Sequence, residues 1–151
     1  MRRYTPAPLA DPGGYILLAE HNEDDADLTT HALKALGFAD KIVTARDGPE
    51  ALSMVFSVGI FAERHPTLPH LVLLDINLPG MSGLHVLEAL RSNRRSKSLP
   101  VVMLTSSAHG RDIIESFVRG ANGIVQKPID SAAAAVLAGL KHRRLHLKVP
   151  M

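Results

Sequence analysis

The feature that most constrains this chain is a set of five short apolar runs, most of which are aliphatic on both faces. The runs are Tyr15–Ala19, Lys41–Ala45, Leu71–Leu74, Val101–Leu104 and Gly123–Gln126. A strand is apolar on both faces when helices cover both sides of its sheet. The segments between the runs carry apolar residues at helical spacing, as at Leu28, Ala32 and Ala35 in the first segment. Five strand-then-helix units predict a doubly wound α/β fold around a parallel sheet.

Residues suited to capping mark the ends of several predicted helices. The expected N-caps are Asp25, Ser82 and either Asp130 or Ser131. Their side-chain oxygens can accept hydrogen bonds from the free N–H groups of a first helical turn. Gly37 and Gly120 follow the first and fourth helices as expected C-caps.

The composition fits one domain that does not bind nucleic acid. With 151 residues, of which 46% are hydrophobic, the chain can bury one ordinary core. We expect a domain over residues 14–148, with a flexible leader over 1–13 and a tail over 149–151. The formal net charge of +2 is too small for the basic surface of a dedicated nucleic-acid binder. The absence of cysteine excludes disulfides, thiolate catalysis and zinc sites built on sulfur.

No segment has the form of a signal peptide or a membrane span. Residues 1–14 contain two arginines and three prolines but no long apolar run. The longest apolar stretch, Ala132–Leu140, is far shorter than the ~20 residues that a membrane helix needs. We therefore expect a cytoplasmic protein that has no membrane partner.

Polar side chains with complementary chemistry follow the predicted strands. Glu20 comes directly after the first run, Asp75 after the third, Thr105 after the fourth and Lys127 after the fifth. The carboxyl ends of parallel strands meet at one edge of the sheet, where ligands of doubly wound folds bind. A carboxylate can act as a nucleophile there, while an ammonium and a hydroxyl hold phosphoryl oxygens. The set predicts a site for phosphoryl transfer.

Four stretches of this sequence resemble the signature motifs of bacterial two-component receiver domains. They read ILLAEHNEDD, LVLLDINLPGMSG, VVMLTSS and GANGIVQKP, and they occur in the family's order over about Tyr15–Leu145. The resemblance implies a five-stranded parallel sheet of order 2-1-3-4-5 in a flavodoxin-like (CheY-like) three-layer sandwich. The wording DINLPGMSG and the ending KPID are most similar to single-domain response regulators that partner phytochrome-type histidine kinases.

The resemblance also implies a role for each residue of the predicted site. Asp75 matches the phosphoacceptor and a metal ligand, and the backbone carbonyl of Asn77 matches a second ligand. Thr105 matches the switch hydroxyl that moves toward the phosphoryl group, and Lys127 matches the lysine that contacts it. The bond from Lys127 to Pro128 matches a cis peptide bond. The implied cofactor is magnesium or another divalent cation.

His21 departs from the family pattern. The family has two acids after the first strand, the second being a metal ligand, whereas this chain has Glu20 and then His21. Magnesium prefers oxygen ligands, and imidazole suits zinc, copper, nickel or iron. His21 is therefore a ligand for a softer metal, a drifted position, or a side chain turned to solvent. Glu20 could compensate directly or through a water, and so could a nearby Glu23 or Asp24.

Ile124 is the second departure, because many family members carry an aromatic switch residue there. Isoleucine cannot rotate inward as an aromatic gate does, so its packing would change instead.

The predicted function is that of a stand-alone response regulator. A sensor histidine kinase, of phytochrome type by resemblance, phosphorylates Asp75, and the surface of the fourth helix, fifth strand and fifth helix then binds a downstream protein, a phosphotransferase or a second copy of the chain. The alternative is a receiver-like interaction module in which His21 weakens magnesium-dependent phosphorylation. An enzyme is not expected, since a phosphatase with an aspartate nucleophile needs a second Asp where Asn77 stands.

Overall fold

The computed structural model describes residues 15–35, 37–38, 41–56, 68–107 and 109–130, together with 132, 133, 135, 137 and 139. The strands are β1 (Tyr15–Ala19), β2 (Lys41–Ala45), β3 (Leu71–Asp75), β4 (Val101–Thr105) and β5 (Gly123–Gln126). The helices are α1 (Glu23–Ala35), α2 (Gly48–Phe56), α3 (Gly83–Arg91) and α4 (Gly110–Val118). The described residues after position 130 are helical and fall in the expected fifth helix. The expected leader and tail, and both ends of the expected domain, lie outside the described residues.

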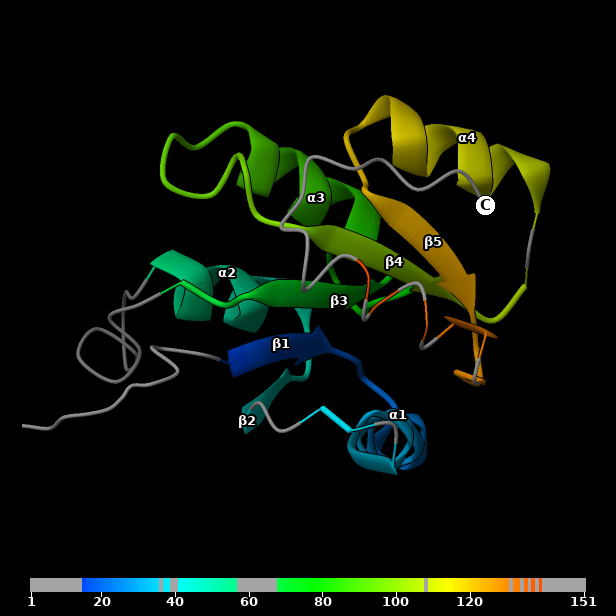
Figure 1. Cartoon of the computed structure of the whole chain (residues 1–151). Helices are drawn as coiled ribbons and strands as arrows, with labels where there is room; N and C mark the ends of the chain where they lie inside the picture. The colour runs from blue at the N-terminus through cyan, green and yellow to red at the C-terminus, as the bar shows by residue number, and fades with distance from the viewer. Residues whose placement is uncertain are drawn as a thin grey trace, which may run out of the picture.

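The five strands form one parallel sheet in the order β2-β1-β3-β4-β5 (Figure 1). Residues of α2, α3 and α4 pack against one face of the sheet, and residues of α1 and of the helical segment after β5 pack against the other. The predicted three-layer sandwich and its strand order are confirmed. The order reverses beside β1 and β3, which places the carboxyl ends of these two strands at the expected binding edge.

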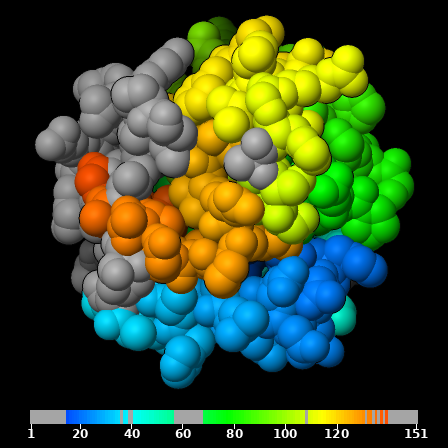
Figure 2. Space-filling model, turned by 90° about the vertical axis from the view of Figure 1, so that its right-hand side faces the viewer, coloured from blue at the N-terminus to red at the C-terminus, as the bar shows by residue number. Residues whose placement is uncertain are grey.

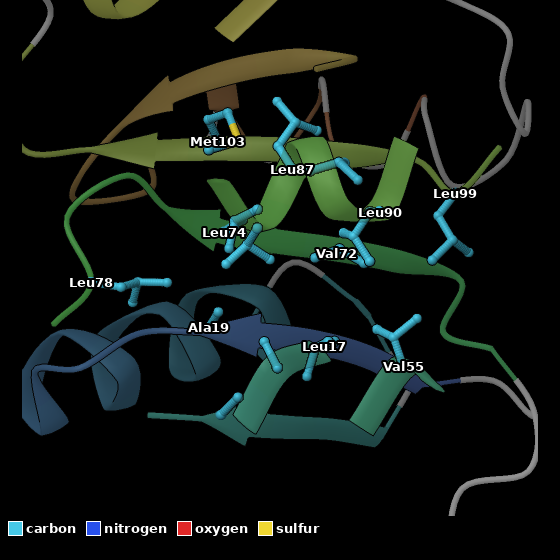
Figure 3. Close-up of a cluster of buried hydrophobic side chains, with 14 of the residues drawn as sticks. Leu17, Ala19, Val55, Val72, Leu74, Leu78, Leu87, Leu90, Leu99 and Met103 are labelled. Carbon is cyan, nitrogen blue, oxygen red and sulfur yellow. The ribbon is translucent and has the colours of Figure 1, made fainter. Parts of the chain in front are cut away.

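Alternate side chains of each strand enter two separate cores. On β1, Leu17 joins the core with α2 and α3, while Ile16 joins the core with α1. Figure 3 shows the first core, in which Leu17 and Leu74 of the sheet lie near Leu87 of α3 and Val55 of α2. A one-residue slip would move every strand side chain into the wrong core, so burial on both faces fixes the register. The register in turn fixes which residues end each strand.

The structure corrects the predicted start and inner face of α1. Asn22 caps this helix, because its Oδ1 accepts a hydrogen bond from the backbone N of Asp25 at 2.8 Å. The buried residues of α1 are Ala26, Thr29 and Leu33, and the side of the helix that carries Leu28 faces outward, with Leu28 59% exposed. The buried face of α1 therefore lies about one residue further along the chain than the apolar stripe predicted from the sequence, and the N-cap is Asn22 and not Asp25.

The other expected caps are confirmed where the structure describes them. Ser82 caps α3 by accepting a hydrogen bond from the backbone N of Leu84 at 3.1 Å. Asp130 accepts one from the backbone N of Ala133 at 2.9 Å. Gly37 and Gly120 have φ angles of +93° and +104°, a left-handed backbone suited to the ends of α1 and α4. Within the described part of the chain, no helix is both long enough and apolar enough to cross a membrane.

Candidate functional site

Asp75 is the last residue of β3 and lies buried at the carboxyl edge of the sheet, with 4% of its surface exposed. Its Oδ1 accepts a hydrogen bond from the backbone N of Asn77 at 2.9 Å. Its backbone lies against the start of α3, where a Cβ on Gly83 would come 2.1 Å from the carbonyl oxygen of Asp75. Only glycine at position 83 permits this approach, so Gly83 allows the start of α3 to pack against the backbone of Asp75.

Lys127 directly follows β5, and its ammonium binds three carboxylates at once. Its Nζ lies 2.9 Å from Oε1 of Glu20, 3.0 Å from Oδ2 of Asp75 and 3.0 Å from Oδ2 of Asp25. The lysine side chain is only 11% exposed. Burial lowers the pKa of Lys127, but the hydrogen bonds that its ammonium donates to the three carboxylates outweigh this effect and hold the pKa above its ordinary value. The lysine is therefore a charged ammonium at the edge of the sheet.

Glu20 directly follows β1 and is almost fully buried beside Asp75. Burial raises the pKa of Glu20, and the neighbouring Asp75 carboxylate raises it further. Hydrogen bonds from Lys127 and from the backbone N of Asn22 oppose this rise without cancelling it, so the pKa stays above its ordinary value. The two buried acids depend on one ammonium for compensation.

Asp25, in the first turn of α1, is a member of this cluster that sequence reasoning missed. It was expected to cap the helix, but its carboxylate reaches across to Lys127, 102 residues later in the chain. The sequence did hold a signal, since Asp25 lies one helical turn before the buried Thr29 and so shares its side of α1. Glu23 and Asp24, which the sequence offered as substitute acids, are exposed, and Oε2 of Glu23 instead lies 3.8 Å from Nη2 of Arg46.

Thr105 ends β4 and is buried, but its hydroxyl is held by the following loop. Its Oγ1 donates a hydrogen bond to the carbonyl oxygen of Ser107 and accepts one from the backbone N of Ser107 at 3.2 Å. The structure thus gathers Asp75, Glu20 and Lys127 in direct contact and leaves the Thr105 hydroxyl bound to the β4–α4 loop.

A cavity of about 250 Å³ opens beside these groups. It is lined by Asp25, Leu28, Thr29, Ser106, Lys127 and Pro128. Figure 2 views the edge at which the strands end, and there the blue atoms of α1 lie next to the orange segment that follows β5. Lys127 is thus both bound to the acids and present in the wall of a cavity.

The family is decided by comparison with known proteins. A model of the response regulator receiver domain matches residues 16–137. The chain belongs to this family. It is a receiver of two-component signalling, as the resemblance of its four motifs predicted.

Individual relatives of this receiver include phytochrome response regulators. The chain is 35% identical over 108 residues to response regulator Rcp1 of Synechocystis sp., which covers 72% of each protein. It resembles the solved structure of the bacteriophytochrome response regulator AtBRR with a TM-score of 0.77 and 35% identity, over 91% of this chain and 97% of that one. It also resembles the Mn²⁺-bound form of Rcp1 with a TM-score of 0.72 and 29% identity, over 91% and 99% of the two chains. The narrower resemblance to phytochrome-associated regulators is thereby confirmed.

The oxygen donors of this receiver fit a hard divalent cation. Asp75 ends β3, Glu20 directly follows β1, and Asn77 lies two residues after the end of β3. Magnesium commonly binds one or two protein carboxylates and keeps several waters. His21 is exposed, as the solvent-facing alternative predicts. Among the described residues, no group of three or more His, Asp or Glu side chains is arranged to hold a metal ion. The fit therefore rests on two carboxylates and a carbonyl, and His21 as a ligand stays a prediction.

The remaining two family positions lie on either side of Lys127. Ile124 is 4% exposed and lies in the core between β5 and the helices on that face. The Lys127–Pro128 peptide bond is cis, the geometry that the resemblance implies for this receiver.

Proposed function

We propose that this receiver accepts a phosphoryl group on Asp75 from a sensor histidine kinase. The observation that carries the proposal is the contact between the Lys127 ammonium and Oδ2 of Asp75 at 3.0 Å. The contact puts a fixed positive charge where the oxygens of a phosphoryl group on Asp75 would lie. The kinase is proposed to be of phytochrome type, because proteins named as phytochrome response regulators are among the relatives.

In the proposed transfer, a carboxylate oxygen of Asp75 attacks the phosphorus of a phosphohistidine on the kinase. The new P–O bond forms as the P–N bond breaks, and the leaving imidazole takes up a proton. Lys127 keeps its positive charge and turns the hydrogen bond that it gave Asp75 toward a phosphoryl oxygen. A divalent cation held by Asp75, Glu20 and the Asn77 carbonyl would neutralise negative charge on the transferred group. In this reaction the chain accepts the phosphoryl group and is not proposed to act as an enzyme on other substrates.

The proposed switch uses the hydroxyl of Thr105. This hydroxyl is bound to Ser107, so a phosphoryl group can recruit it only if the β4–α4 loop rearranges. A change from 1:99 to 99:1 between two states needs about 5.5 kcal/mol of differential binding, a size that a few charge-assisted hydrogen bonds can supply. Because Ile124 is buried, the signal is proposed to pass through the loop and a change in core packing.

The output surface is proposed to be α4, β5 and the helix after it. Ile114 and Val118 of α4 are 63% and 75% exposed and lie one helical turn apart, which gives this face apolar area for a partner. The partner is a downstream protein, a phosphotransferase or a second copy of the chain. We propose a cytoplasmic location and no role for nucleic acid or membrane, on the small net charge of the chain.

Binding of beryllofluoride, which imitates a phosphoryl group on Asp, tests the proposal. The unaltered chain is expected to bind it with Mg²⁺ or Mn²⁺, and Asp75→Asn is expected to abolish binding because the attachment oxygen is lost. Fluorine NMR would detect the bound species. Capture that survives Asp75→Asn would contradict the proposal.

The alternative function, an interaction module that works without phosphorylation, is favoured by His21, because histidine stands where the family pattern has an acid and its side chain is exposed. If the unaltered chain binds no beryllofluoride with either metal but His21→Asp does, the alternative stands.

A further inference from the structure

The Lys127 ammonium has three N–H donors, and each one bonds to a carboxylate from a different element. Glu20 follows β1, Asp75 ends β3 and Asp25 belongs to the first turn of α1. The sequence led us to expect only the first two as anions of this site. The third carboxylate comes from a helix and has no counterpart in the predicted set.

The ammonium and a divalent cation need the same oxygens. Oε1 of Glu20 and Oδ2 of Asp75 hold Lys127, and these two carboxylates are also the side-chain ligands available to a hard cation. With His21 exposed, the site has no spare acid at that position. An ammonium held by Glu20 and Asp75 alone would compete with the cation for both of them.

We propose that Asp25 is a positioning residue: it holds the Lys127 ammonium on the α1 side of the site when Glu20 and Asp75 turn from the ammonium to a divalent cation. The inference rests on the proposed function, since it concerns the cation that assists phosphorylation of Asp75. Asp25 suits the task because its Oδ2 lies 3.0 Å from Nζ while its side chain remains 41% exposed. It therefore reaches the buried lysine from the outer side of the site.

The affinity of the full chain for Mn²⁺, measured by titration calorimetry, tests this role. Asp25→Ala is expected to weaken Mn²⁺ binding by about tenfold, the low end of the loss seen when a partner of the ligand groups is removed. Asp24→Ala is the matched control, because it removes the same charge from the neighbouring, exposed position of α1. The control is expected to change the affinity by less than about twofold, since exposed charges are screened by salt.

A double-mutant cycle with Lys127→Met tells whether Asp25 acts through the lysine. In that background Asp25→Ala is expected to change Mn²⁺ affinity by less than about twofold, because no ammonium remains to be moved. The proposal is overturned if the tenfold loss persists without Lys127, if Asp24→Ala matches Asp25→Ala, if Asp25→Ala has no effect, or if the unaltered chain binds no Mn²⁺.

These outcomes are separable from failure of the proposed function. A chain whose Mn²⁺ affinity depends on Asp25 through Lys127 but which captures no beryllofluoride would retain the role of Asp25 and lose phosphorylation of Asp75. A chain that captures beryllofluoride on Asp75 but whose Mn²⁺ affinity does not depend on Asp25 would retain phosphorylation of Asp75 and lose the proposed role of Asp25.

Discussion

Replacing Lys127 by methionine removes the ammonium that, among the described residues, binds both buried acids, and it keeps the apolar stem. The lysine binds Glu20 and Asp75, whose side chains are 2% and 5% exposed, and Asp25, whose side chain is 41% exposed. The pair with Asp25 is screened by solvent and counts for little in stability. The carboxylates of Glu20 and Asp75 are buried away from water, so the loss of the Lys127 ammonium as their partner determines how much the substitution lowers stability.

Removing one partner of a buried ion pair costs about 3–5 kcal/mol, because the remaining charge stays buried and uncompensated. We expect Lys127→Met to lower the free energy of unfolding by about 3–5 kcal/mol at neutral pH in the absence of metal. A typical domain has about 5–15 kcal/mol in total, so the expected loss is a large fraction of the stability and is measurable by urea unfolding.

The effect depends on pH through Glu20. The pKa of Glu20 in the folded protein is raised by burial and by Asp75, so the folded state holds this proton more tightly than the unfolded state. Stability from a raised carboxyl pKa is fully present below the unfolded pKa and is lost as pH rises through the folded pKa. The ammonium of Lys127 opposes the rise, so its removal raises the pKa of Glu20 further and extends the loss to higher pH. The destabilisation is therefore expected to be smaller near pH ~4, where Glu20 holds its proton, than near pH ~8.

Urea denaturation in EDTA across this pH range measures the effect. Lys97→Met, at an exposed lysine, is the matched control and is expected to change stability by less than about 0.5 kcal/mol. A loss in Lys127→Met that is equal at all pH values, or that stays below about 1 kcal/mol near pH ~8, would refute the reasoning.

Two further substitutions test the packing around the site. Gly83→Ala places a Cβ 2.1 Å from the carbonyl oxygen of Asp75 and 2.9 Å from Cα of Ile76. We expect it to lower the free energy of unfolding by about 3 kcal/mol or more, as measured by thermal or urea unfolding. The control Gly110→Ala meets no atom within 4 Å and should be neutral or slightly stabilising. Ser116→Ala on α4 removes a buried hydroxyl that has no hydrogen-bond partner within the described structure, and it should raise the free energy of unfolding by about 1 kcal/mol; a loss of similar size would show that the hydroxyl is satisfied.

The strands and their ends were predictable because they depend on local patterns. The five aliphatic runs became the five strands, with only Asp75 and Thr105 added at the ends of β3 and β4. The residues after the strands had to meet at one edge once the sheet was parallel, so Asp75, Glu20 and Lys127 were found from the sequence. The rotation of α1 was not predictable in the same way, since Leu28 and Leu33 both fit a helical stripe and only packing decides which is buried.

The sequence by itself determined the sheet, its doubly wound topology and the residue types at its carboxyl edge, because each of these follows from periodicity and from the order of the motifs. The tertiary structure alone decided that Asp25 accepts the third hydrogen bond of the Lys127 ammonium and that the Thr105 hydroxyl is bound to Ser107. The first depends on the rotation of α1 about its axis, and the second on the course of the β4–α4 loop. Both are set by contacts between segments far apart in the chain or by loop backbone, which no local pattern specifies.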